Sequence, residues 1–148
     1  MKVDKGCIAG RTYEDYLAFR AANPDISVVE MDTVHGRQGG KALLALHFVD
    51  THFMLAILID GLTAFYVAQA FIWLRRTLGF DLYGKLFALI LTDRGSEFSS
   101  PKAIEFDEDG EGRTRFFYCD PQQSQQKGSA EKKSLRNPPQ SAQRHVIR

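Results

Sequence analysis

The sequence is poor in cysteine, and its two cysteines stand far apart. Cys7 lies near the N-terminus, and Cys119 lies within an apolar run. Two thiols in these places do not make the disulfide framework of a small secreted domain, and they give no support to a structural zinc site. Both are therefore expected to be reduced thiols in a reducing compartment.

Long apolar runs are missing as well. A membrane-spanning helix needs about 18 consecutive apolar residues, and no window of the sequence reaches that length. The first ten residues, MKVDKGCIAG, lack the apolar stretch of a signal peptide. The hydrophobic share of 44% is still enough for a core, and 148 residues is the size of one ordinary domain. We expect a soluble, cytoplasmic protein with no membrane partner.

The chain as a whole has no excess of one charge, because it contains 19 Lys and Arg and 18 Asp and Glu. The two signs are nevertheless unevenly distributed. Residues 1–121 hold 13 basic and 17 acidic side chains, whereas residues 122–148 hold 6 basic and 1 acidic. The acidic part is where a metal site would find its ligands. The basic end suits contact with phosphate, and it equally suits a solvated, disordered tail.

Hydrophobic periodicity predicts a mixed α/β chain. Three β-rich segments follow one another with short connections, the first two joined by a glycine-rich turn, and they predict three antiparallel strands. Later strands are separated by helical patterns, and one of them, LFALIL, has no polar residue, as in a strand buried on both faces. The expected helices are 11–22, 65–76, 101–106 and one from 129 onward, and the expected strands are 26–34, 42–49, 52–59, 86–91 and 114–119.

This order predicts an α/β fold with a mixed five-stranded sheet and flanking helices, the order of ribonuclease H-like folds. Within it, residues 1–25 form an N-terminal lead-in helix, residues 26–133 form the core, and residues 134–148 form a basic, disordered tail. The expected last helix is short because Pro138-Pro139 stops it after about two turns.

Three acidic residues are candidates for chemistry. Asp32 lies inside the first strand between apolar neighbours, where a carboxylate is costly unless it is paired or binds a cation. Asp93 directly follows the apolar strand, and the carboxyl ends of buried strands are where α/β sheets place ligands. Glu131 would lie in the first turn of the last helix. The three can meet at one point if the first and fourth strands are neighbours.

Each acid also has a purely structural explanation. Asp32 could face water at a strand edge, Asp93 could cap the turn Asp-Arg-Gly, and an acid in a first helical turn is favoured by the helix dipole. Acting together, three carboxylates could hold two hard cations about 4 Å apart, the arrangement that promotes phosphodiester transfer. Oxygen ligands of this kind suit Mg²⁺ or Mn²⁺.

Three segments of the sequence resemble the catalytic blocks of the IS-thirty family of bacterial insertion-sequence transposases. They are VVEMDTVHG, ILTDRGSEF and YCDPQQSQQKGSAEK, they occur in the family's order, and the resemblance covers about residues 26–133. It implies that Asp32, Asp93 and Glu131 are the catalytic ligands of two Mg²⁺ or Mn²⁺ ions. Their separations are 61 and 38 positions.

The resemblance implies a DDE transposase with an integrase-like core that cleaves a DNA strand and transfers the freed 3′-hydroxyl in DNA transposition and integration. It also implies that Gly95 lets the backbone turn beside the site. The expected partners are DNA, as transposon ends and target, and a second copy or a full-length transposase, in the bacterial cytoplasm. The candidates for DNA contact are Arg94, Lys127, Lys132 and Lys133.

The sequence departs from the family at both ends. Only 31 residues precede Asp32, which leaves no room for a helix-turn-helix region, and the segment after Glu131 has no apolar periodicity. These departures, typical of a truncated product, keep open a second hypothesis, an inactive remnant that at most binds DNA or a full-length transposase. A third is a metal-dependent nuclease of the same fold that cuts without joining.

Overall fold

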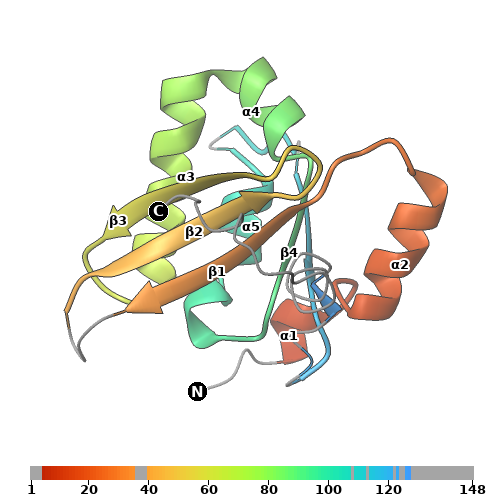
Figure 1. Ribbon diagram of the computed structural model, residues 1–148, viewed down its shortest axis with the longest axis horizontal. Helices are drawn as coiled ribbons and strands as arrows, with labels where there is room; N and C mark the ends of the chain where they lie inside the picture. The colour runs from red at the N-terminus through yellow and green to blue at the C-terminus, as the bar shows by residue number, and fades with distance from the viewer. Residues whose placement is uncertain are drawn as a thin grey trace, which may run out of the picture.

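The computed structural model describes residues 5–35, 40–107, 109–112, 114–121, 123 and 126–127. Two helices precede a run of three strands, and each of the two later strands follows a pair of helices (Figure 1). The elements are α1 (Lys5–Ile8), α2 (Tyr13–Ala22), β1 (Val29–His35), β2 (Ala42–Phe48), β3 (Phe53–Ile59), α3 (Ala64–Leu78), α4 (Phe80–Leu86), β4 (Leu89–Thr92), the 3-10 helix η1 (Ser96–Phe98), α5 (Pro101–Glu105) and β5 (Arg115–Tyr118).

The five strands form one mixed sheet in the order β3-β2-β1-β4-β5. β1 pairs antiparallel with β2, and β2 pairs antiparallel with β3, whereas β4 lies parallel to both β1 and β5. The predicted mixed five-stranded α/β sheet is therefore confirmed, and its order is consistent with a ribonuclease H-like fold. The central strand β1 joins the antiparallel half of the sheet to the parallel half.

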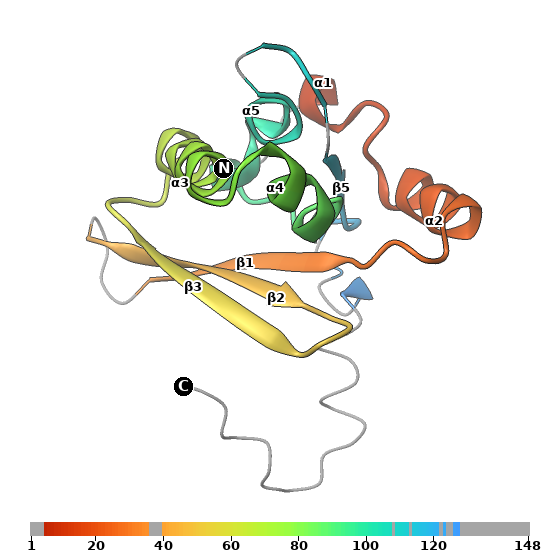
Figure 2. The ribbon, with the colours of Figure 1, turned by 90° about the horizontal axis from the view of Figure 1, so that it is seen from above.

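Each face of the sheet has its own apolar core. On one face, Met31 of β1 and Ile90 of β4 pack with side chains of α3 such as Phe71 and Leu74. Figure 2 shows α3, α4 and α5 together on one side of the sheet. On the other face, Tyr16 of α2 packs with Leu91 and neighbouring side chains. The strand alternation assigns every second residue of β1 and β4 to each face.

The helix α2 confirms the one predicted in the lead-in region. Thr12 is its N-cap: the hydroxyl of Thr12 accepts a hydrogen bond from Asp15 N, and the Asp15 carboxylate accepts one from Thr12 N. This reciprocal pair satisfies two backbone donors that the first turn of a helix leaves free. The short helix α1 was not predicted, since its four residues are too few for a periodic pattern.

The predicted fourth strand begins too early. Leu86 ends helix α4, and β4 begins only at Leu89, so the run LFALIL is divided between a helix end, a turn and a strand. The turn between α3 and α4 at Gly79 has a φ of 88°, a backbone conformation that favours glycine. The four residues of β4 are all buried, as predicted for a strand covered on both faces.

Three further predictions concern residues that the structure does not describe. These are residues 36–39 of the glycine-rich turn, the last helix from Ser129 and the tail 134–148. The remaining predicted strands and helices lie within a few residues of their observed bounds. None of the helices in the described part of the chain has the length and apolarity needed to span a bilayer.

Candidate functional site

The parallel pairing of β1 with β4 places two of the candidate acids next to each other, Asp32 within β1 and Asp93 directly after the end of β4. The ladder pairs Val29 with Ile90 and Met31 with Thr92. The next positions along the two strands are Asp32 and Asp93. Neighbouring strands lie about 4.8 Å apart, so the two carboxylates extend from backbones roughly one strand spacing apart. The condition set by the sequence, that the first and fourth strands be neighbours, is met.

The same alternation places both acids on one face. Met31 and Ile90 belong to the core under α3, whereas Leu91 belongs to the core under α2. Asp32 follows Met31, and Asp93 lies two positions after Leu91, so both take the α2 face. The Thr92 hydroxyl on the opposite face donates a hydrogen bond of 3.0 Å to Met31 O and links the end of β4 to β1.

The carboxylate of Asp32 is accessible from solvent, with 57% of its side chain exposed. Its Oδ1 accepts a hydrogen bond of 2.8 Å from Thr33 N, and its Oδ2 lies 3.6 Å from the ammonium nitrogen of Lys127. The partners described for this carboxylate are thus one backbone donor and one cation. Lone pairs remain available to a further cation.

The carboxylate of Asp93 is fixed by the turn that follows it. Its Oδ1 accepts a hydrogen bond of 3.0 Å from Gly95 N, an Asx turn that holds the side chain at the end of β4. The structural explanation for Asp93, a turn cap, therefore applies. It does not exclude a ligand role, because an ionised carboxylate has two oxygens and several lone pairs.

A side chain at residue 95 would collide with the Glu97 carboxylate, whereas the backbone angles of Gly95 do not need a glycine. Its φ of −68° suits any residue. A Cβ at this position would lie 2.6 Å from Oε1 of Glu97, too close for any real contact. The other oxygen of Glu97 accepts a hydrogen bond of 2.7 Å from the Thr33 hydroxyl, across 64 positions of sequence. Gly95 thus makes room for the contact that ties the η1 turn to β1.

Lys127 is buried beside the site, although its segment was expected to face DNA phosphate. Only 8% of its side chain is exposed, and Nζ lies 3.5 Å from Met31 O in addition to its contact with Asp32. A buried ammonium is stable only with such partners. In this arrangement the charge of Lys127 is directed to the carboxylate.

Arg94 links the carboxyl ends of β4 and β5. Its Nε donates a hydrogen bond of 3.0 Å to Cys119 O, and its guanidinium lies 3.9 Å from the Asp120 carboxylate. The backbone of Cys119 also donates to Thr92 O at 2.7 Å, which continues the parallel ladder by one step. Arg94 keeps 23% of its side chain exposed, so part of its guanidinium remains open to solvent.

The loop that leads to Lys127 is closed by Asp120 and Gln126. Asp120 N donates to Gln126 Oε1 at 2.8 Å, and Gln126 Nε2 donates back to the Asp120 carboxylate at 3.1 Å. This two-way amide contact sets the position from which Lys127 reaches β1. The role of Gln126 was not predicted from the sequence.

Cys119, directly after β5, is a buried thiol beside the site. Burial raises the pKa of the Cys119 thiol to about 12, and the negative charges of Asp93, Glu30 and Asp120 act in the same direction while Lys127 opposes them. The thiol is therefore protonated at neutral pH.

Glu30 is a buried acid that sequence reasoning did not select. It is 5% exposed and points to the same face as Asp32, two positions earlier in β1. The signal was present in the alternation of VVEMDTV, which gives Glu30 and Asp32 a common face. Glu30 was not selected as a candidate because Asp32, in the same strand, is nearer to Asp93.

Glu131, Lys132 and Lys133 lie outside the described residues. Among the residues that are described, no three or more His, Cys, Asp or Glu side chains gather closely enough to hold a metal ion. The described part thus supplies two of the three expected ligands. Both offer carboxylate oxygens, the donors that Mg²⁺ and Mn²⁺ prefer, and the Asp32 oxygens are accessible, so this part of the donor set fits such ions.

Comparison with known proteins adds no assignment to this geometry: no protein-family model matches the chain, and no curated protein matches its sequence.

Proposed function

We propose that this chain is the catalytic core of a DDE transposase, which cleaves a DNA strand and joins its 3′-hydroxyl to a target phosphodiester with the help of divalent metal ions. The observation that carries the proposal is the parallel pairing of β1 with β4, which sets Asp32, within β1, beside Asp93, directly after β4, on one face. The likeness of three sequence segments to the IS-thirty transposases supports the same assignment.

Asp32 and Asp93 would hold the metal ions, with Glu131 as the third ligand. Bound Mg²⁺ or Mn²⁺ supplies an activated oxygen nucleophile and offsets the charge of the leaving oxygen. The residues of the chain contribute position. The Asx turn at Gly95 fixes the Asp93 carboxylate, and the Thr92 hydroxyl links the end of β4 to β1.

Basic side chains at the rim would bind the DNA backbone. Arg94 presents a partly exposed guanidinium beside the site, and a planar guanidinium forms paired hydrogen bonds with phosphate. Lys132 and Lys133 are further candidates from the sequence. Lys127, the fourth candidate, is buried beside Asp32, so it is not proposed as a DNA contact.

Calorimetric titration with Mn²⁺ is the direct test of the metal site. The wild-type chain is expected to bind, and Asp32→Asn and Asp93→Asn are expected to abolish binding, because each keeps the side-chain shape and removes a charge. Asp25→Asn is the matched control, since Asp25 is an exposed acid in the turn before β1. No binding by a folded wild-type chain would refute the metal site and favour the inactive remnant.

A DNA assay separates the remaining alternatives. A labelled duplex with a donor end is incubated with the chain, Mg²⁺ and a target plasmid. Cleavage followed by joining to the plasmid supports the transposase. Cleavage without joining would identify a nuclease of the same fold, and metal binding without either reaction would identify a remnant with a preserved site.

A further inference from the structure

The two edges of the sheet are treated differently by the rest of the chain. At the β5 edge, Tyr118 N donates a hydrogen bond of 2.8 Å to Arg11 O, and the Tyr16 ring of α2 packs against the Phe117 ring at 5.9 Å. At the other edge, β3 pairs with β2 alone among the described strands. The outer backbone groups of β3 therefore face away from the sheet.

β3 lacks the features that protect the edges of natural sheets. Edge strands usually carry a charged residue, a proline or a bulge that discourages further pairing. The sequence of β3, FMLAILI, contains no charge and no proline, and all seven residues pair with β2 in unbroken register. Phe53 and Leu58 are 59% and 62% exposed. Such a strand is suited to receive another strand.

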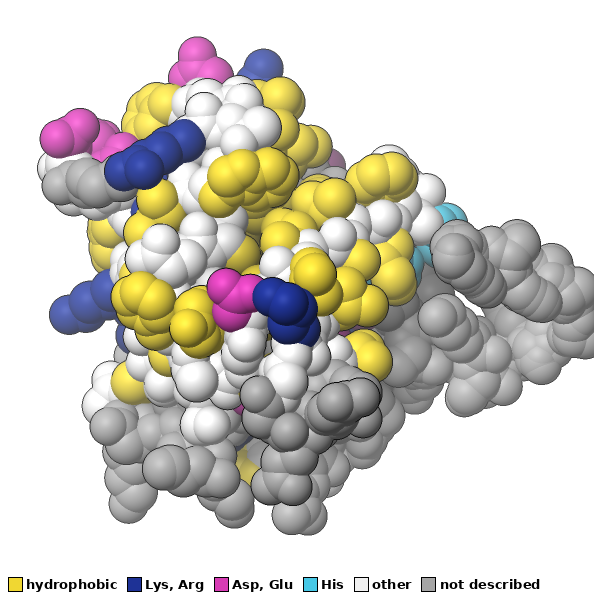
Figure 3. Space-filling view, turned by 90° about the vertical axis from the view of Figure 1, so that its left-hand side faces the viewer, with side chains coloured by type: hydrophobic (Ala, Val, Ile, Leu, Met, Phe, Trp, Pro, Cys, Tyr) yellow, Lys and Arg dark blue, Asp and Glu magenta, His cyan; other side chains and the backbone are white. Residues whose placement is uncertain are grey.

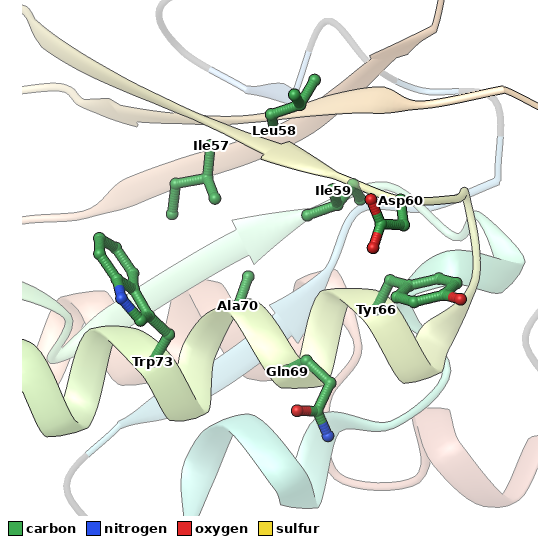
Figure 4. Close-up of a pocket in the computed structure, with 8 residues that line it drawn as sticks. All are labelled: Ile57, Leu58, Ile59, Asp60, Tyr66, Gln69, Ala70 and Trp73. Carbon is green, nitrogen blue, oxygen red and sulfur yellow. The ribbon is translucent and has the colours of Figure 1, made fainter.

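Apolar side chains continue from β3 onto the neighbouring helix. Trp73 and Phe65 of α3 are 55% and 63% exposed. Between β3 and α3 lies a groove of about 300 Å³ (Figure 4). Figure 4 shows Ile57 and Ile59 pointing from β3 toward α3, and Leu58 pointing away. The space-filling view of Figure 3 shows apolar side chains gathered over one side of the molecule.

We propose that β3 is a dimerisation edge, along which β3 of a second copy of this chain pairs antiparallel about a two-fold axis at Ala56. A two-fold axis at this residue pairs Phe53 with Ile59, Met54 with Leu58 and Leu55 with Ile57 of the other copy. Every pair is apolar, so the contact is complementary to itself, as an isologous interface requires. The inference does not depend on the metal chemistry.

The ends of the paired strands bring no two like charges together in this register. The residues that flank the apolar pairs are His52 and Asp60, and the axis at Ala56 places His52 of each copy near Asp60 of the other. Asp60 keeps its ion pair with Lys41 of its own chain, and His52, with a φ of 61°, precedes the extended strand, so the pairing is limited to residues 53–59.

The groove gives the proposed partner strand a place for its largest side chain. In this register Phe53 of the second copy lies opposite Ile59, on the side of the sheet that faces α3. Ile59 and Tyr66 line this end of the groove, and Trp73 lines the other end beside Ile57 (Figure 4). An exposed phenylalanine on one copy and an apolar hollow on the other thus coincide, which is the relation expected of an anchoring residue and its pocket.

Cysteine cross-linking tests the register. In a Cys7→Ser background, Ala56→Cys should cross-link to itself through a short thiol-specific reagent, because directly opposed Cβ atoms lie about 5 Å apart. Met54→Cys and Leu58→Cys should each fail alone, since Met54 lies about 13 Å from Met54 of the second copy. A mixture of the two variants should cross-link. Self-linkage of Met54→Cys without linkage of Ala56→Cys would overturn the register.

Sedimentation velocity tests the dimer itself. The wild-type chain, of 16.7 kDa, is expected to shift toward twice that mass as its concentration rises. Leu58→Lys should raise the dissociation constant at least tenfold, whereas Leu17→Lys, on the exposed side of α2, should leave it unchanged. A monomer at every concentration would overturn the proposal and would leave the edge to residues 128–148 or to a different protein.

Discussion

The ammonium nitrogen of Lys127 lies 3.6 Å from Oδ2 of Asp32, so that a cation already neighbours the most accessible carboxylate of the site. The lysine is 8% exposed and the aspartate 57%. This contact is therefore a competitor, from within the chain, for any metal ion that Asp32 binds. It makes Lys127 the residue through which metal affinity is most easily altered.

Lys127→Met should tighten Mn²⁺ binding. The substitution keeps the apolar stem and removes a positive charge next to the bound ion, a repulsion of about 1 kcal/mol for two unit charges about 4 Å apart in bulk water. Calorimetry should show a roughly fivefold lower dissociation constant. Lys102→Met, on the exposed surface of α5, serves as the control and should change nothing. Weaker binding in Lys127→Met would show that the lysine supports the site and does not compete with the ion.

Gly95→Ala should destabilise the fold by breaking the contact between Thr33 and Glu97. A Cβ at residue 95 would displace the Glu97 carboxylate and remove its hydrogen bond with the Thr33 hydroxyl, at a cost of about 1 kcal/mol. Urea unfolding of Gly95→Ala, Glu97→Ala and the double variant measures the coupling. If the cause is as stated, the double variant is no less stable than Glu97→Ala. Additive losses would point to strain at Gly95 itself.

Thr12→Ala should lower the free energy of unfolding by about 1 kcal/mol at neutral pH, because it removes the N-cap of α2. Hydrogen bonds from Thr12 lower the pKa of Asp15 below its ordinary value of 3.8. A lowered pKa in the folded state stabilises above pH 3.8, and this part is lost as the pH falls through the folded pKa. The difference in the free energy of unfolding between wild type and variant should therefore become smaller at acidic pH. A difference that stays constant with pH would show that the Asp15 carboxylate does not contribute to the effect.

Cys119 should limit stability in alkali. Its pKa is about 12 in the folded protein against 9.0 for an ordinary thiol, so the unfolded state loses the proton first. The stabilisation is complete below pH 9, and about 1 kcal/mol is lost by pH 10. Cys119→Ala should show less of this loss in urea unfolding at pH 7 and pH 10. Tyr16, whose pKa burial raises to about 12, contributes to the same range in both proteins.

A thiol assay checks the same prediction without a stability measurement. In the folded chain at pH 8, Cys119 should stay unreactive and the half-buried Cys7 should react, while in urea both should react. Rapid reaction of Cys119 in the folded state would contradict the shielding that raises its pKa.

The strands could be predicted from the sequence because each has an apolar pattern of its own. β2 and β3 lie within one residue of their predicted bounds, and the neighbouring positions of Asp32 and Asp93 followed once β1 and β4 were taken as adjacent. The short helices could not be predicted. α4, FDLYGKL, contains a glycine and is too short for a clear period, so its formation depends on packing, for example of the buried Tyr83.

Contacts of the site across long sequence separations were also beyond prediction. Lys127 meets Met31 O across 96 positions, and the Thr33 contact with Glu97 spans 64. The periodicity of apolar residues predicts which face of a strand or helix a side chain lies on. It does not predict which side chain from another element contacts it. For this reason Lys127 was expected at the surface and Glu97 was assigned no partner.

The mixed pairing of β1 has a consequence for the order of folding. Its pairing with β2 joins residues close in the chain, whereas its pairing with β4 joins residues 61 positions apart. Local hairpins close with a smaller loss of chain entropy than distant pairings, so the three-stranded meander can form before β4 pairs with β1. Asp32 is then held in a sheet before Asp93 arrives beside it, and the two carboxylates are brought together only in the last step of sheet formation.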